Sequence, residues 1–252
     1  MRKIASLLFA AAFIAVLVVT ASGCSLMTST IRFTYKGASN YTAGGCEVTD
    51  VKDIDVDWVS GSIEIVTNSG DTVVVSETTN KEIEDELKVH CWLDGGTLRI
   101  RFCKSGIKTG SRFSGVEKKL TVSVPESISI GKLEIDDVSA NLTASGVNVG
   151  TVGIDSVSGD ITLDLPSKTV KVDTVSGDIG IKAFDDADYD IDTVSGDTTI
   201  DISACSGIKI VFDTVSGTIS GSAEFRIDGK KYINGDGSAT FDINSVSGDI
   251  KV

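Results

Sequence analysis

Apolar residues in the second half of the chain recur with a period of about 19 residues. The tripeptide Val-Ser-Gly, or a close variant, begins at seven positions, and successive intervals include 19, 18, 19 and 21 residues. The repeat valines are Val59, Val138, Val157, Val175, Val194, Val215 and Val246. A fixed period of this length is typical of a protein built from stacked copies of one structural unit.

Three further positions of the repeat are apolar in almost every copy. They lie five and three residues before the repeat valine and four residues after it, as Val152, Ile154 and Ile161 do around Val157. Thr198 is the single polar exception. A spacing of two residues is strand periodicity, and the three-residue step from Ile154 to Val157 breaks it, which indicates a bend. Each copy is therefore expected to contain two or three short strands separated by corners.

One such unit cannot bury its apolar face alone, but stacked units form parallel strand ladders around a continuous core. We therefore predict an all-β fold in which residues 131–252 form a parallel β-solenoid with rungs of about 19 residues. Residues 225–233, within the 31-residue interval between Val215 and Val246, are expected to form an inserted hairpin.

The repeat is interrupted between Val59 and Val138. Residues 87–102 instead alternate apolar and polar residues about Gly95-Gly96, which is the pattern of a β-hairpin. Residues 46–130 are accordingly expected to form an N-terminal β-hairpin cap that includes the first rung and covers the open end of the ladder.

The first 23 residues have the pattern of an export signal. Arg2 and Lys3 precede an apolar run over residues 4–19, and small residues lead to Cys24. The segment Ala-Ser-Gly-Cys that ends at Cys24 resembles the lipobox of bacterial lipoproteins, in which the cysteine is lipid-modified and becomes the first residue of the mature chain.

This resemblance implies a signal peptide over residues 1–23, lipidation of Cys24 and a lipid-anchored tether over residues 24–45. The protein would then be extracytoplasmic and anchored to the bacterial cell membrane. The alternative is an uncleaved anchor helix, although the apolar run of residues 4–19 is shorter than the roughly 20 residues that span a bilayer.

Composition excludes several classes of function. The chain has 36 acidic and 23 basic residues, a net charge of −13. Nucleic acid is therefore not an expected partner, because Lys and Arg must replace the counterions of the phosphates. His90 is the only histidine, so a His-rich metal site is impossible, and no Gly-x-Ser-x-Gly nucleophile elbow occurs. We expect no catalytic residues and no cofactor.

The repeat also places aspartates in two columns, two residues before and three residues after the repeat valine. Stacking would align them as a first acidic row and a second acidic row. The first acidic row contains Asp155, Asp173 and Asp192, and the second contains Asp160, Asp178 and Asp197. Unit charges one rung apart repel by about 1 kcal/mol in bulk water, so some compensation is expected.

Two interpretations of these rows remain open. They could form a surface for a weakly bound cation such as Ca²⁺, which takes several oxygen ligands, or for a partner. Alternatively, the aspartates and the Ser and Thr hydroxyls beside them could cap backbone N–H groups at the corners. We favour the corner interpretation, because the glycine-rich nonapeptide of calcium-binding solenoids is absent.

Four cysteines remain besides Cys24. In the register expected for the hairpin, Cys91 lies opposite Ile100 on an apolar face and Cys103 points to the other face. A Cys91–Cys103 disulfide is therefore disfavoured, and Cys91 is expected to be a buried thiol. The pairing of Cys46, Cys103 and Cys205 stays open in a compartment where disulfides can form.

Several segments together resemble a known family. They are Ile-Asp-Val-Asp-Trp-Val-Ser-Gly at 54–61, Gly-Gly-Thr-Leu-Arg-Ile at 95–100, Lys-Lys-Leu-Thr-Val-Ser-Val-Pro at 118–125 and the tandem Thr-Val-Ser-Gly-Asp-Ile segments. Their order is similar to that of the bacterial "putative adhesin" domain, a domain of unknown function in envelope-anchored proteins. The resemblance covers about residues 40–252. It implies a β-helix-like fold, extracytoplasmic placement and an adhesin role, and it supplies no catalytic residues.

Two hypotheses for function follow. The favoured one is a non-catalytic, envelope-anchored surface module, an adhesin or scaffold whose acidic solenoid binds a cell-envelope or extracellular protein or glycan. The alternative is a calcium-dependent, polysaccharide-cleaving β-helix enzyme. Such an enzyme needs Arg or Lys near its carboxylates to bind an anionic sugar, and the two acidic columns contain neither.

Overall fold

The computed structural model describes residues 33–108 and 111–252. The expected signal peptide, its alternative as an anchor helix, and the expected lipidation site Cys24 lie outside the described residues. No helix in the part of the chain that the structure describes is long and apolar enough to cross a membrane.

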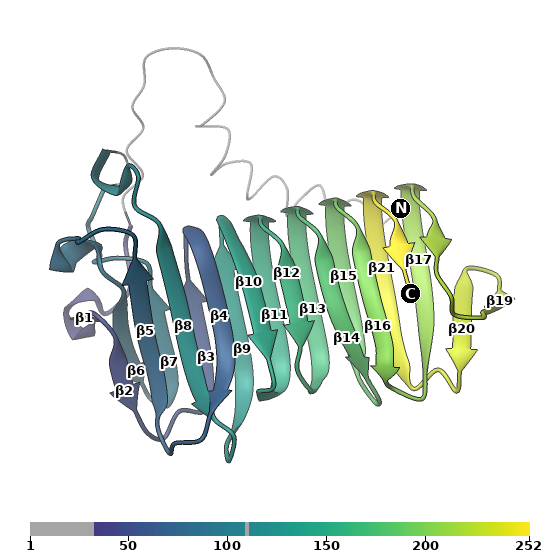
Figure 1. The fold of residues 1–252 in the computed structure, drawn as a ribbon, viewed down its shortest axis with the longest axis horizontal. Helices are drawn as coiled ribbons and strands as arrows, with labels where there is room; N and C mark the ends of the chain where they lie inside the picture. Colours follow the sequence, from purple (N-terminus) through teal and green to yellow (C-terminus); the bar gives the residue numbers. More distant parts are fainter. Residues whose placement is uncertain (1–32, 109–110) are drawn as a thin grey trace, which may run out of the picture.

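The described residues form two long β-sheets stacked into an elongated body (Figure 1). The 12-stranded sheet contains, in spatial order, β1 (Thr42–Ala43), β6 (His90–Asp94), β7 (Thr97–Arg101), β3 (Asp53–Asp57), β9 (Ser129–Asp137), β11 (Asn148–Ser158), β13 (Ser167–Ser176), β15 (Asp188–Ser195), β21 (Ala239–Ser247), β17 (Gly207–Ser216), β20 (Lys231–Gly235) and β19 (Arg226–Asp228). The 10-stranded sheet contains β18 (Ile219–Ser220), β22 (Ile250–Lys251), β16 (Thr198–Ala204), β14 (Ile179–Phe184), β12 (Ile161–Asp164), β10 (Ser139–Ser145), β4 (Ser60–Asn68), β8 (Lys118–Pro125), β5 (Val73–Thr79) and β2 (Cys46–Val48). Three short 3-10 helices are also described, namely η1 (Ala38–Asn40), η2 (Asp85–Leu87) and η3 (Ser111–Phe113).

The all-β solenoid expected from the repeat is confirmed. Each copy contributes one strand to each sheet, and the sequence register of the repeat is the hydrogen-bonding register of the strands. Val152 pairs with Val170 and Ile154 with Val172 across β11 and β13. These side chains are buried, as are those of the column four residues after the repeat valine from Ile63 to Thr198. Burial of these columns between the sheets produces the continuous core.

Glycine occupies the turn from one sheet to the other in six of the seven copies, and Ala140 stands there in the remaining one. At Gly177, φ is 124°, and a Cβ would lie 2.1 Å from the carbonyl oxygen of Gly159 in the preceding copy. Neither the conformation nor the space suits a larger residue. The tight corner therefore fixes the distance between stacked backbones.

The copies do not stack in chain order. The last copy lies between the two copies that precede it, because β21 pairs with β15 on one side and β17 on the other, and β22 lies between β16 and β18. In Figure 1 the yellow β21 separates the green β15 from β17. The hairpin expected over residues 225–233 is present as β19 and β20, and it pairs antiparallel with β17 at the end of the 12-stranded sheet.

The expected β6–β7 hairpin is also confirmed, with Leu93 opposite Leu98 and Cys91 opposite Ile100. The expectation that Cys91 is a free thiol is wrong, because Cys91 forms a disulfide with Cys46. Strand β2 runs antiparallel to β5 and so brings Cys46 across from β6 in the other sheet. Cys103, the partner that the register disfavoured, is a buried free cysteine.

The chain joins the folded body earlier than the tether expected over residues 24–45. Phe33 donates its backbone N–H to the carbonyl of Ile107 over 3.0 Å, and β1 pairs antiparallel with β6. The rings of Phe33 and Phe102 lie 6.1 Å apart. Residues 33–45 therefore belong to the cap.

Candidate functional site

The six aspartates singled out in the sequence do not form one site. Asp155, Asp173 and Asp192 lie on β11, β13 and β15 of the 12-stranded sheet, in register with one another. Those of the second acidic row lie at the corners that precede β12, β14 and β16. The two rows are separated by the corner of each copy.

The second acidic row is a ladder of side chain to backbone hydrogen bonds. The backbone N–H of Asp178 donates to the carboxylate of Asp160 over 3.0 Å, and that of Asp197 donates to Asp178 over 2.9 Å. Asp249 continues the ladder, donating its N–H to Asp197 over 2.9 Å. The corner interpretation is thus confirmed for this row, whose carboxylates satisfy backbone groups at the turns.

The adjacent hydroxyls use a different partner from the one expected. Thr174 donates to the carbonyl of Ser176 over 3.2 Å, and Thr193 donates to that of Ser195 over 3.1 Å. A hydroxyl can donate as well as accept, so it satisfies a corner carbonyl instead of an N–H group. Asp137 stands at this position in another copy and accepts the N–H of Ala140 over 2.8 Å.

The first acidic row is partly compensated by neighbouring side chains. Lys171 forms an ion pair with Asp173. Next to Asp192 stands Asn244 of the inserted strand β21, and its Nδ2 donates to Asp192 over 2.8 Å. The insertion therefore places a neutral donor where the row would otherwise continue with a carboxylate.

Toward the N-terminal cap the same row continues through Asp136 to Asp57. Partial removal from water, with the charges of Asp57 and Asp155, raises the pKa of Asp136 to about 7. Burial likewise raises the pKa values of Asp155 and Asp192. Among the described residues, no group of three or more His, Cys, Asp or Glu side chains is arranged to hold a metal ion.

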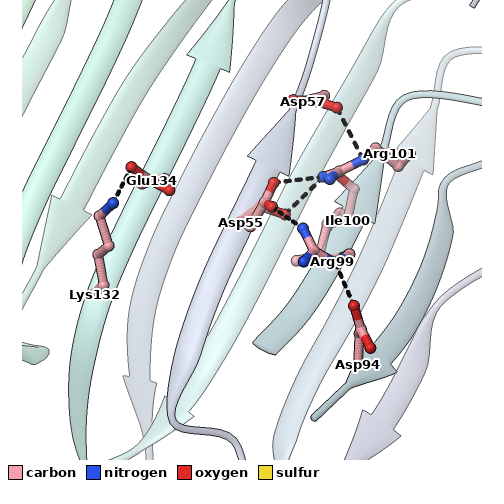
Figure 2. Close-up of polar contacts among 8 residues, drawn as sticks. All are labelled: Asp55, Asp57, Asp94, Arg99, Ile100, Arg101, Lys132 and Glu134. Atoms are coloured by element: carbon pink, nitrogen blue, oxygen red, sulfur yellow. Dashed lines mark hydrogen bonds and ion pairs between the residues drawn. The ribbon is translucent and has the colours of Figure 1, made fainter. Parts of the chain in front are cut away.

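The row ends at two arginines of β7, shown in Figure 2. Parallel pairing of β3 with β7 sets Asp55 beside Arg99 and Asp57 beside Arg101. Arg99 Nη1 lies 2.5 Å from Asp55, and its Nε lies 3.1 Å from Asp94. Arg101 is buried and contacts both Asp55 and Asp57, at 2.7 and 2.8 Å. The guanidinium groups are thereby fixed and neutralised by carboxylates.

A pocket of about 330 Å³ lies over these arginines, and we call it the cap pocket. Its lining includes Tyr35, Tyr41, Asp57, Trp92, Asp94, Arg99 and Arg101. The rings of Tyr41 and Trp92 meet edge to face with centroids 5.5 Å apart. The cap pocket thus combines aromatic walls with paired charged groups.

Sequence reasoning missed this pocket, because it assigned residues 24–45, which include Tyr35 and Tyr41, to a tether. A usable signal was present in Tyr35 and Tyr41, two aromatic residues in an otherwise polar segment. Amphipathic rings of this kind are enriched at binding surfaces.

Comparison with known proteins identifies relatives of the chain. The model of the Toastrack DUF4097 family matches residues 51–167 and 127–252. A solved structure described as a "putative cell adhesion protein" from Clostridium sporogenes ATCC 15579 is 14% identical, with 83% of this chain and 98% of that chain covered and a TM-score of 0.49. A "putative adhesin" from Bacteroides fragilis NCTC 9343 is 12% identical, with coverage of 82% and 96% and a TM-score of 0.34.

A third structure, a "putative lipid binding protein" from Parabacteroides distasonis ATCC 8503, is 16% identical, with coverage of 88% and 100% and a TM-score of 0.26. No curated protein matches the chain.

Proposed function

This chain belongs to the Toastrack DUF4097 family, and from that premise we propose that it is a non-catalytic surface module of the bacterial envelope that binds or scaffolds other envelope or extracellular components. The adhesin role comes from the resemblance of its sequence motifs. The finer role, a specific binding activity, is part of the proposal.

The observation that carries this proposal is the ladder of the second acidic row. Asp160, Asp178 and Asp197 each accept a backbone N–H from the next rung, so these carboxylates stabilise the corners. A glycan-cleaving enzyme needs a carboxylate free to exchange protons with its substrate. The repeated aspartates instead support a rigid body that presents a binding surface.

Placement outside the cytoplasm is part of the same proposal. The Cys46–Cys91 disulfide supports it, because such bonds persist in oxidising compartments and are rare in the cytosol. The export pattern and Cys24 point the same way. If Cys24 carries lipid, the wild-type chain is cleaved before Cys24, and Cys24→Ser, which blocks this cleavage, should migrate on a gel as a longer, uncleaved precursor. If the variant and the wild type instead have the same length and both fractionate with membranes, the anchor helix is favoured.

Binding and turnover distinguish the proposed module from an enzyme. Purified protein is incubated with cell-wall material and with neutral and anionic glycans, with Ca²⁺ and with a chelator. We expect cation-independent binding without product. Calcium-dependent cleavage that is abolished by Asp178→Asn with Asp197→Asn would overturn the non-catalytic assignment.

A further inference from the structure

We propose that the cap pocket binds an uncharged pyranose unit of a glycan, an inference that rests on the proposed function and names the ligand class. The candidate contacts are the rings of Tyr41 and Trp92 and the polar groups of Asp94 and Arg99. Four observations lead to this ligand: the size of the pocket, its fixed aromatic wall, its balance of charge and its pairing of donors with acceptors.

The size suits one or two sugar rings. A volume of about 330 Å³ lies at the lower end of the range for small-molecule sites, roughly 300–1,000 Å³. A long acyl chain or a folded protein segment needs a larger or more extended surface. The pocket therefore fits a compact ligand.

The aromatic wall is held in place by backbone. Gly37 has φ of 70°, and a Cβ at this residue would lie 2.6 Å from Cζ3 of Trp92. The indole therefore packs directly on the backbone of residue 37. Tyr41 contacts Trp92, and its ring centroid also lies 6.0 Å from that of Tyr35. The electron-rich faces of such rings attract the weakly positive C–H groups of a sugar ring.

The charge of the pocket is balanced. Its cations are Lys36, Arg99 and Arg101, and the carboxylates of Asp57 and Asp94 line it with Asp55 directly behind. An anionic ligand would meet guanidinium groups that already have partners, and beyond them the carboxylates of the first acidic row. A cationic ligand would compete with Arg101, whose Cζ lies 5.6 Å from the Tyr35 centroid and 5.9 Å from that of Tyr41.

Donors and acceptors stand side by side. Arg99 Nε lies 3.1 Å from Asp94, and both residues are only half-buried. Each sugar hydroxyl donates one hydrogen bond and accepts others, so an arginine and a carboxylate fixed next to each other match it. A hydrophobic ligand without hydroxyls would remove water from the remaining hydrogen-bonding positions of this pair without replacing it, which costs affinity.

Titration of the mature protein with methyl glycosides of glucose, galactose, mannose and N-acetylglucosamine tests the proposal. Intrinsic fluorescence is a suitable signal, because Trp92 lines the pocket whereas the other tryptophan, Trp58, is buried in the core. We expect a saturable change with at least one glycoside, at a dissociation constant of about 1 mM. Calorimetry with the same glycoside provides a second readout.

Tyr41→Ala and Asp94→Asn should each weaken binding by about tenfold or more. The matched control is Tyr232→Ala, which removes a tyrosine from β20 at the opposite end of the molecule and should leave binding unchanged. Preferential binding of glucuronate or of a peptide over every neutral glycoside would overturn the proposal, as would the absence of a saturable signal in both readouts.

The two proposals can fail separately. If wild-type protein and Tyr41→Ala bind cell-wall material equally, the surface module stands and the pyranose site is wrong. If wild-type protein binds no envelope or extracellular material at all, the proposed function itself is wrong.

Discussion

The side-chain amide of Asn244 donates a hydrogen bond to the carboxylate of Asp192 over 2.8 Å, although the two residues are 52 positions apart in sequence. The bond exists because β21 lies between β15 and β17. Without that insertion, Asp213 of β17 would be the next residue of the first acidic row. One neutral residue thus interrupts a line of carboxylates.

Asn244→Asp should destabilise the protein at neutral pH. Asn244 is buried, and an aspartate there would lose the donor to Asp192 and add a charge between Asp192 and Asp213. We expect a loss of about 1–3 kcal/mol in the free energy of unfolding at pH 8, measured by urea denaturation, and a smaller loss at pH 4. The matched control is Asn148→Asp, an exposed position in β11, which should change stability by less than about 0.5 kcal/mol. Equal effects of the two substitutions would contradict the arrangement of the row.

Asp137 should make stability depend on pH. Burial raises the pKa of Asp137 from its ordinary value of 3.8 to about 6. Because the folded state holds this proton more tightly than the unfolded state, its contribution is most favourable below about pH 4 and is lost as pH rises to about 6. Asp137→Asn keeps an acceptor for the Ala140 N–H and removes the buried charge. The free energy of unfolding of this variant should equal that of wild type at pH 4 and exceed it by about 1–3 kcal/mol at pH 8. A difference that does not change with pH would show that Asp137 does not titrate in this way.

Ile179→Asp should unfold several rungs. Ile179 is 2% exposed and stacks in register with Ile161 and Thr198 in the shared core. An unpaired carboxylate there should cost more than about 4 kcal/mol, seen as a large fall in the melting temperature. Thr162→Asp places the same charge at an exposed position of β12 and serves as the control. Ile179→Val, expected to cost about 0.5–1.5 kcal/mol, keeps the test informative if the aspartate variant does not fold. Unchanged melting of both Ile179 variants would mean that the column does not face inward.

Gly177→Ala should destabilise the corner by about 1–3 kcal/mol or more, since φ of 124° is unfavourable for alanine and the methyl group would meet the carbonyl of Gly159. Ala140 occupies the equivalent corner of the second copy without a positive φ, and Ala140→Gly provides the reciprocal exchange. Thermal melting of both variants checks the effect. A Gly177→Ala protein as stable as wild type would show that the stacked backbones can separate.

The periodicity of the sequence was sufficient to predict the core, because inward and outward positions are set locally within each copy. Val152 and Val170 are equivalent in the repeat and adjacent in the structure for the same reason. The order in which the copies stack could not be predicted in the same way, because every copy presents nearly the same strand edges and any two copies could pair. The position of β21 depends on the length and course of residues 217–238, which no local pattern encodes.

The cap pocket and the disulfide could not be predicted from local sequence patterns either. Cys46 and Cys91 meet only because β2 and β6 lie in different sheets at the same end of the molecule. Tyr35 and Tyr41 stand in a segment whose composition resembles a tether, and their packing on Arg101 depends on the parallel pairing of β3 with β7. Contacts between elements distant in sequence, not propensities, create the site.

The order of the last three copies determines how the rows of side chains end away from the cap, and a cross-linking experiment tests that order most directly. Thr199 is in register with Lys251, which in turn is in register with Ser220. Adjacent strands lie about 4.8 Å apart, within reach of a disulfide, whereas strands two positions apart lie at roughly twice that distance and beyond reach. We expect Thr199→Cys with Lys251→Cys to oxidise to an intramolecular disulfide, and Thr199→Cys with Ser220→Cys to remain reduced. Ready oxidation of the second pair and not the first would show that the copies stack in chain order and would contradict the inserted position of the C-terminal strands.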